Sequence, residues 1–188
     1  MATLKPNEVM TPKFRVSFPD LFEAKSFNNQ EAKFGLQMLF DKKTDLSELK
    51  KVVKHVIKEK WGTEPPKSLV LPFKDGNEKE LEGYQNTIVV GATSKFQPQV
   101  IDQKREPIHT PDDIYAGCFA RAVIGAYAWE YKQGGKVMKR GVSFNINSVQ
   151  KLTEGERFVK RVDAADLFDE VEDSSNDASN FESDDFDL

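Results

Sequence analysis

Two repeating patterns of apolar and polar residues run along the first sixty positions of the chain. Residues 13–18 alternate, with Phe14, Val16 and Phe18 on one side and polar residues on the other, which is the period of a half-buried strand. Pro19 is expected to end that strand. Residues 33–40 alternate again and predict a second strand. Between residues 45 and 60 the apolar positions recur every three to four residues, which predicts a helix.

The predicted helix carries signals at both ends. Asp45 and Glu48 have the spacing of a capping box, and Lys58 and Lys60 lie in the last turn before Gly62.

The second half of the chain predicts further strands at residues 87–93, 99–102 and 141–149, with a long charged loop at 103–113. Residues 117–132 alternate small and large side chains, which favours a strand even though alanine itself favours helix. Gly125, in the middle of this segment, suggests a β-bulge or a sharp bend, as a closed barrel requires.

These elements predict a mainly β fold with one helix. A small barrel of the oligonucleotide-binding (OB) type has five strands and fits this set, and a split α+β sheet fits it as well. We divide the chain into a flexible N-terminal arm (1–12), an OB-fold-like domain (13–162) and a disordered acidic C-terminal tail (163–188).

Composition narrows the class of protein. No apolar run approaches the roughly 20 residues that span a bilayer, and the first ten residues lack the pattern of a secretory signal, so we expect a soluble intracellular protein without a membrane partner. One cysteine, Cys118, excludes an internal disulfide, and two histidines argue against a metal cluster. We expect no metal and no cofactor.

The charge is distributed unevenly along the chain. Residues 163–188 hold eleven Asp and Glu and no Lys or Arg, which leaves 27 basic and 20 acidic residues in 1–162, a net charge of +7. A basic body with an acidic tail is typical of a nucleic-acid-binding protein that carries an internal competitor. A nearly neutral domain with a solvating tail explains the same charges.

Motifs for catalysis are missing from the sequence. It contains no phosphate-binding loop of the G-x-x-x-x-G-K-[ST] type and no G-x-S-x-G. Asp112 and Asp113 could hold a metal in a nuclease, but carboxylates in a polar loop are more often solvated or cap a helix. We therefore expect no enzyme activity.

An aromatic row gives the chain a candidate binding surface. Tyr127, Trp129 and Tyr131 are spaced by two and would project from one face of a strand, near several cationic residues. Rings that stack on bases beside Lys or Arg that neutralise phosphates can bind single strands without regard to sequence. Such rings are also common in cores. Eight residues make up the candidate DNA surface: Lys13, Arg15, Arg121, Tyr127, Trp129, Tyr131, Lys139 and Arg140.

The end of the tail, NFESDDFDL (180–188), combines acidic and apolar residues. Its carboxylates could compete with DNA for a cationic groove, and its apolar side chains could dock in a pocket on a partner protein. A purely solubilising tail explains the acids but not the apolar residues. The candidate partner-binding residues are Phe181, Asp184, Asp185, Phe186, Asp187 and Leu188.

Five segments, taken in order, resemble one family. They are KFRVSFPDLFEAK, then DG followed by EGY, FQPQVID, IYAGC, and GVSFNINSVQKL, which together span about residues 13–152. The family is that of the phage single-stranded DNA-binding proteins first catalogued as a domain of unknown function. The resemblance implies an OB fold and sequence-independent binding of single-stranded DNA. It also implies a role in phage replication or recombination inside the host, and an acidic C-terminal tail.

The sequence therefore predicts a non-enzymatic single-stranded DNA-binding protein of the host cytoplasm. Its expected partners are single-stranded DNA and, through the tail, replication or recombination proteins. The sequence leaves open whether the chain forms a homo-oligomer. Two alternatives remain: a protein–protein adaptor or virion component without DNA affinity, and a metal-dependent nuclease.

Overall fold

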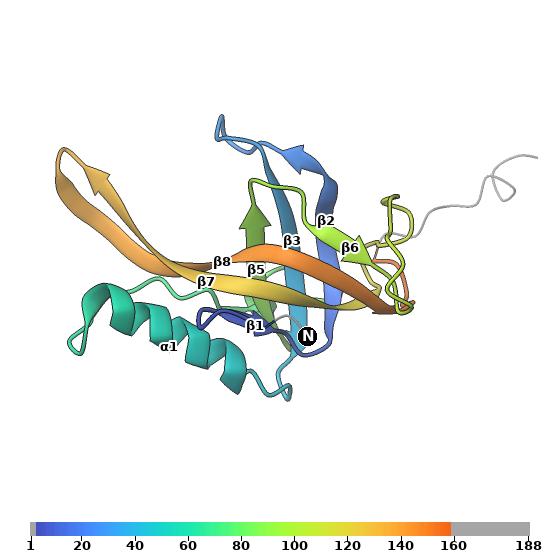
Figure 1. The fold of residues 1–188 in the computed structure, drawn as a ribbon, viewed down its shortest axis with the longest axis horizontal. Helices are drawn as coiled ribbons and strands as arrows, with labels where there is room; N and C mark the ends of the chain where they lie inside the picture. The colour runs from blue at the N-terminus through green and yellow to red at the C-terminus, as the bar shows by residue number, and fades with distance from the viewer. Residues whose placement is uncertain (1–2, 159–188) are drawn as a thin grey trace, which may run out of the picture.

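The computed structural model describes residues 3–158, which form a strand-rich body with a single α-helix (Figure 1). The elements follow one another as β1 (Glu8–Met10), β2 (Phe14–Lys25), β3 (Lys33–Asp41), α1 (Ser47–Trp61), β4 (Lys74–Asp75), the 3-10 helix η1 (Gly76–Glu78), β5 (Thr87–Ser94), β6 (Gln99–Ile101), β7 (Phe119–Gln133) and β8 (Lys136–Thr153).

Five of the strands close into a ring. β7 pairs with β2, β2 with β3, β3 with β5, β5 with β8, and β8 again with β7. All of these pairings are antiparallel except β5–β8, where Ala92 lies beside Phe144 in a parallel ladder. The short strands β1, β4 and β6 add to β7, β5 and β8. The prediction of a mainly β, OB-like barrel with one helix is confirmed, and the open split sheet is not what forms.

The interior of the ring explains the alternation of small and large residues in β7. Ala120, Ala122 and Ala126 point inward and are buried, and Ala126 pairs directly with Phe144. The small side chains leave room for large ones from the other strands, such as Phe14 and Phe40, whose rings meet edge to face with centroids 5.7 Å apart. Alanine therefore appears here in a strand because its size fits the core.

The hairpin of β7 and β8 is the longest feature of the sheet. The strand predicted at 117–132 is confirmed with a shift of one or two residues at each end, and β8 is longer than the predicted 141–149. The predicted irregularity near Gly125 is also present, since the β7–β8 register shifts between Val123 and Ile124 and leaves Asn147 as the extra residue.

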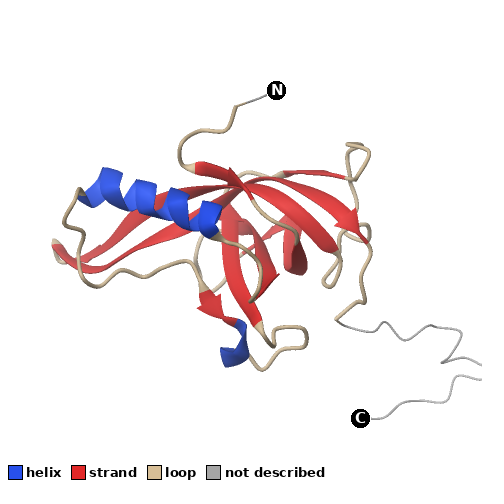
Figure 2. Cartoon of the chain, turned by 90° about the horizontal axis from the view of Figure 1, so that it is seen from below, coloured by secondary structure: helices blue, strands red, loops and turns tan. Residues whose placement is uncertain are grey.

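The helix predicted at 45–60 is confirmed as α1, but its predicted capping box is wrong. Leu46 occupies the N-cap position and makes no capping bond through its side chain, while Asp45 accepts a hydrogen bond from the Ser47 backbone N–H at 2.9 Å. The apolar face of α1 is buried against the sheet, and Figure 2 shows the helix alongside the arm formed by β7 and β8.

Pro19 does not end the strand that begins near residue 13. β2 continues to Lys25, and its register with β3 shifts between Ser17 and Asp20. Phe18 has a φ of 44° at this shift, so the backbone leaves the regular ladder where Pro19 cannot donate a hydrogen bond.

The arm predicted at residues 1–12 is partly structured. Glu8–Met10 forms β1, Val9 is buried, and Thr11 exchanges hydrogen bonds with Ala122. Three residues are too few to show an alternating pattern, so the sequence could not reveal this strand. The predicted tail (163–188) and its boundary at residue 162 lie outside the described residues. No helix within residues 3–158 has the length and apolarity to cross a membrane.

Packing of α1 on the barrel gives a stability prediction. Leu49 is completely buried, so Leu49→Ala should lower the free energy of unfolding by about 3 kcal/mol through lost burial and the cavity that remains. Lys50→Ala, its exposed neighbour, should change that energy by less than about 0.5 kcal/mol. Urea unfolding measures both. Equal stability of the two variants would show that this face of α1 is not packed.

Candidate nucleic-acid interface

Three aromatic side chains lie on the outer face of β7. Tyr127 is 41% exposed, Tyr131 is 55% exposed and Trp129 is half-buried. The residues between them point to the other face, because successive side chains of a strand alternate. The aromatic row is therefore outside the core, as a surface that stacks on bases requires.

The ring of Trp129 is fixed by two residues of β8. Its Nε1 donates a hydrogen bond to Ser143 Oγ at 2.9 Å. Gly141 pairs with Trp129, and a Cβ atom added to Gly141 would lie 2.6 Å from the indole ring. The ring thus lies over the backbone of Gly141, and a side chain at that position would displace it.

Lys139 joins the aromatic row, whereas Arg140 lies on the other face of the hairpin. Lys139 pairs with Tyr131 and is exposed. Arg140 pairs with Glu130, and its Nε lies 3.6 Å from a carboxylate oxygen of Glu130. The same oxygen accepts a hydrogen bond from Trp61 Nε1 at 3.1 Å, and this bond, together with nearby cations, lowers the pKa of Glu130. Arg140 therefore faces α1 rather than the rings.

Arg15 is engaged by the protein itself. Its Nε donates to the Gly117 carbonyl at 3.1 Å and its Nη2 to the Glu156 carbonyl at 2.8 Å. The guanidinium lies 4.3 Å from the ring centroid of Phe158 and 5.8 Å from that of Phe119. Arg15 thereby ties residues 156–158 to the barrel, which is a structural role that the sequence did not reveal.

The remaining two cations lie apart from the rings. Lys13 Nζ is 5.3 Å from the Phe119 centroid, at the same end of β7 as Arg15. Arg121 is exposed and donates from Nε to Gln150 Oε1 at 2.9 Å. It precedes Tyr127 by six residues, which is about 20 Å along a strand. The structure therefore brings four of the eight predicted residues together, namely Tyr127, Trp129, Tyr131 and Lys139.

Two exposed phenylalanines extend this surface, and the sequence analysis missed them. Phe27 is 68% exposed in the loop between β2 and β3, and Phe96 is 83% exposed in the loop after β5. An ion pair of 2.8 Å between Glu31 and Lys95 joins the two loops. A phenylalanine inside an otherwise polar loop was the signal that could have identified them.

The face between these loops and the aromatic row is built from small or polar residues. On β3 and β5 the outer positions include Gln37, Gly91 and Thr93, and Asn145 of β8 lies beside Thr93. Figure 1 shows the β2–β3 loop and the β7–β8 hairpin rising on the same side of the barrel. In OB folds the corresponding strands and loops bind oligonucleotides.

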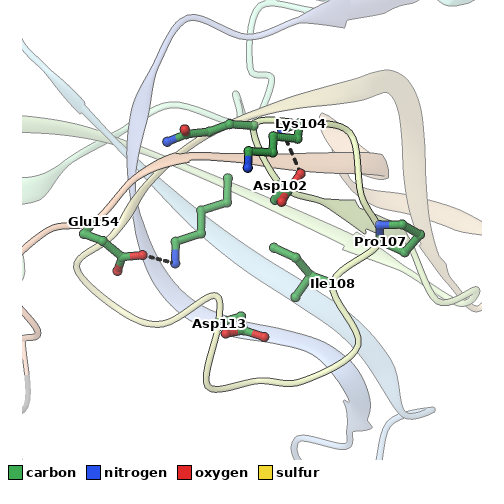
Figure 3. A pocket seen from close by; sticks show the side chains of 8 residues that line it. Asp102, Lys104, Pro107, Ile108, Asp113 and Glu154 are labelled. Atoms are coloured by element: carbon green, nitrogen blue, oxygen red, sulfur yellow. Dashed lines mark hydrogen bonds and ion pairs between the residues drawn. The ribbon is translucent and has the colours of Figure 1, made fainter.

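A polar hollow of about 410 Å³ lies near the far end of β8 (Figure 3). Asp102, Asp113 and Glu154 line it. The Asp113 carboxylate accepts a hydrogen bond from the Thr110 hydroxyl, and hydrogen bonds, first from Lys151 and then from Tyr115, lower the pKa of Glu154. Within residues 3–158, no group of three or more His, Cys, Asp or Glu side chains is arranged to hold a metal ion. Cys118 is buried, and burial raises the pKa of its thiol.

Residues 7–179 match the family described as Enterobacter phage Enc34, ssDNA-binding protein. The chain belongs to this family. It is 34% identical, over 157 residues, to protein p50 of Acyrthosiphon pisum secondary endosymbiont phage 1; the match covers 77% of this chain and 82% of p50.

Solved structures of phage single-stranded DNA-binding proteins share the fold. The protein of bacteriophage Enc34 is 26% identical, with a TM-score of 0.66 over 88% of this chain and 92% of its own. The same protein in complex with single-stranded DNA is 24% identical, with a TM-score of 0.68 over 82% and 91%. The gp2.5 protein of bacteriophage T7 is 13% identical, with a TM-score of 0.56 over 92% and 98%.

The match to the Enc34 family extends beyond the described barrel, through residue 179. It ends just before the segment 180–188. The six predicted partner-binding residues of that segment, Phe181, Asp184, Asp185, Phe186, Asp187 and Leu188, lie outside the described residues. Their role stays a prediction.

The contacts of Arg15 give the second prediction. Arg15→Ala should lower the free energy of unfolding by about 2 to 3 kcal/mol, because two charged hydrogen bonds to backbone carbonyls are lost. Lys13→Ala removes an exposed cation just before the same strand and should change the free energy of unfolding by less than about 0.5 kcal/mol. Thermal and urea unfolding measure the difference, and an Arg15→Ala variant as stable as Lys13→Ala would contradict the structural role.

Proposed function

We propose that this chain binds single-stranded DNA without sequence preference, across the face between the β2–β3 loop and the β7–β8 hairpin. It acts without enzymatic activity in the replication or recombination of phage DNA, in the host cytoplasm. The observation that carries the proposal is the aromatic row of β7, which is exposed on the side of the barrel with which OB folds bind oligonucleotides.

The chemistry of this face suits a flexible single strand. A base stacked on an aromatic ring contributes on the order of 1–3 kcal/mol, whichever base it is. Tyr127, Trp129 and Tyr131 supply rings on one side, and Phe27 and Phe96 supply them on the other. Gly91 and polar residues such as Thr93 and Asn145 lie between these rings, and they leave room for the DNA backbone to approach.

Cations next to the rings would neutralise the phosphates. Lys139 stands beside Tyr131, and Lys132 and Lys136 flank the hairpin turn. Lys95 pairs with Glu31 through two exposed side chains, and such pairs contribute little stability, so a phosphate can replace the carboxylate. If about four phosphates are neutralised, log K should fall with log salt at a slope of roughly −2.8.

The acidic segment 163–188 would regulate this face. Its eleven carboxylates compete with DNA for the lysines, and its apolar residues recruit replication or recombination proteins once DNA has displaced it. Arg15 ties residues 156–158, the last that the structure describes, to the barrel.

Tryptophan fluorescence gives a direct test, because Trp61 and Trp129 are the only two tryptophans. Oligo-dT should quench the protein, and quenching should persist in Trp61→Phe but be lost in Trp129→Phe. Trp61 is the matched control, since it lies on the opposite face of the hairpin. Tyr131→Ala should weaken binding roughly tenfold, in line with the loss of one stacked base.

Three results would contradict the proposal. Quenching that depends on Trp61 alone would place DNA on the other face. A folded protein without affinity for oligo-dT at 50 mM salt would favour the adaptor or virion component. Degradation of the oligonucleotide that requires Mg²⁺ and is lost in Asp113→Ala would indicate a nuclease.

Removal of residues 163–188 tests whether this segment competes with DNA for the lysines. The shortened protein should bind oligo-dT roughly tenfold tighter than the full chain at 50 mM salt. At 0.5 M salt the ratio of the two dissociation constants should approach one, because salt screens the tail from the lysines. Anisotropy titrations at both ionic strengths measure this. A full chain in which Asp184, Asp185 and Asp187 are changed to Asn should have an affinity between those of the full and the shortened protein. Equal affinities of the full and the shortened protein at low salt would refute the competition.

A further inference from the structure

We propose that a second subsite for single-stranded DNA lies on the outer face of the sheet, where a small pocket takes one base and Arg121 takes the adjoining phosphate. The inference rests on the proposed function, because it extends the path of the same DNA strand beyond the aromatic row. It adds β1 and β6 to the elements that contact DNA.

The pocket lies on a four-stranded part of the sheet. β1, β7, β8 and β6 are side by side in that order, as Figure 1 shows. Met10 of β1 pairs with Val123 of β7. Arg121 of β7 pairs with Gln150 of β8. These side chains point outward, because Ala122, which lies between Arg121 and Val123, points into the core and is buried.

A hollow of about 170 Å³ opens between these side chains. Met10, Ile101 and Val123 give it apolar walls, and Met10 is 47% exposed. Arg121 and Gln150 form part of its polar rim. Pockets for small-molecule ligands usually measure roughly 300–1,000 Å³, so this smaller hollow suits a single flat ring. A nucleobase has two apolar faces and a polar edge, and both match the lining.

Arg121 is held in place by hydrogen bonds that leave its end open. Its Nε donates to Gln150 Oε1 at 2.9 Å, and Gln150 Nε2 donates in turn to the Asp102 carbonyl at 3.0 Å. The Asp102 carboxylate accepts from the backbone N–H groups of Lys104 and Glu106. Among residues 3–158, neither Nη atom of Arg121 has a hydrogen-bond or ion-pair partner. The guanidinium therefore offers both of these nitrogens to a phosphate, in an orientation that is fixed in advance.

Polar side chains connect the pocket with the aromatic row. Asn145 Nδ2 donates to Asn147 Oδ1 at 2.6 Å, and Asn147 Nδ2 donates to Glu8 Oε1 at 2.9 Å. The Glu8 side chain is only 16% exposed, and Lys5 forms an ion pair with it at 3.8 Å. A DNA strand that crosses this part of the face meets amide groups and a carboxylate whose charge is already compensated.

The spacing of the two subsites fits one continuous strand of DNA. Val123 precedes Tyr127 by four residues, which is about 13 Å along β7, and both side chains lie on its outer face. Stacked nucleotides follow one another at about 3.4 Å, so about four nucleotides bridge this distance, and fewer suffice in an extended strand. The whole path stays within the roughly 4–16 nucleotides that an OB fold covers.

Salt dependence tests the phosphate contact of Arg121. With oligo-dT of about 16 nucleotides, Arg121→Ala should weaken binding roughly tenfold at about 50 mM salt. It should also reduce the magnitude of the slope of log K against log salt by about 0.7, the contribution of one phosphate. Oligo-dT of about 4 nucleotides, measured by quenching of Trp129, covers only the aromatic row and should bind the variant and the unmodified chain equally. Lys54→Ala, the matched control, removes an exposed cation of α1 and should change neither quantity.

Met10→Ala tests the base pocket. Loss of one apolar wall should weaken binding of the longer oligonucleotide roughly fivefold and leave the salt slope unchanged, because no charge is removed. Leu71→Ala is the matched control, since Leu71 is also 47% exposed and lies outside the pocket. Circular dichroism checks that each variant keeps the fold.

The outcomes separate this subsite from the proposed function. Failure of the unmodified chain to bind either oligonucleotide would refute the proposed function itself. Normal binding of both, with Arg121→Ala and Met10→Ala indistinguishable from their controls, would overturn only the second subsite. Equal weakening on the short and the long oligonucleotide would also overturn it, because the two residues would then act on the aromatic row. An effect of Arg121→Ala without one of Met10→Ala would overturn the base pocket.

Discussion

The parallel ladder between β5 and β8 is the contact on which the rest of the structure depends. It closes the ring at Ala92 beside Phe144 and Thr93 beside Asn145. Because the closure uses only a few residues in the middle of β8, both ends of that strand remain available. One end pairs with β6, and the other continues with β7 into the hairpin that carries the aromatic row.

Alternation along β7 links the core to the proposed binding face. Ala122, Ile124 and Ala126 pack into the interior of the ring, while Arg121, Tyr127 and Tyr131 are exposed on the outside. One strand therefore meets two unrelated demands, a tight interior and an aromatic exterior. A shift of the pairing by one residue would exchange the two faces, so the bulge at Asn147 and the turn at Gly134 matter to binding as well as to stability.

Much of the fold could be predicted because periodic patterns are long in this chain. The alternation runs through the whole of 117–132 and the helical period through the whole of 45–60, and both predicted elements are present in the structure. β1 escaped prediction because it has three residues and forms by pairing with the distant residues 123–125 of β7. The prediction that Pro19 ends the strand is wrong because a bulge, which the sequence does not display, accommodates its missing N–H.

The candidate site was predicted less completely, for a different reason. Spacing identifies which residues share a face of one strand, and it placed Tyr127, Trp129 and Tyr131 correctly outside the core. It cannot say which segments from elsewhere lie opposite. Arg15 therefore looked available although two carbonyls occupy it. Phe27 and Phe96 were overlooked because the two loops that carry them meet only when β3 pairs with β5.

Gly141 has a consequence for how selective this protein can be. An indole that rests on bare backbone and is hydrogen-bonded to Ser143 has already given up its rotational freedom before any ligand arrives. Little further entropy is lost when a base meets such a platform, so the gain differs among nucleotides only through their own surface and polarisability. A rigid, featureless plane of this sort fits the proposed binding of single-stranded DNA without sequence preference.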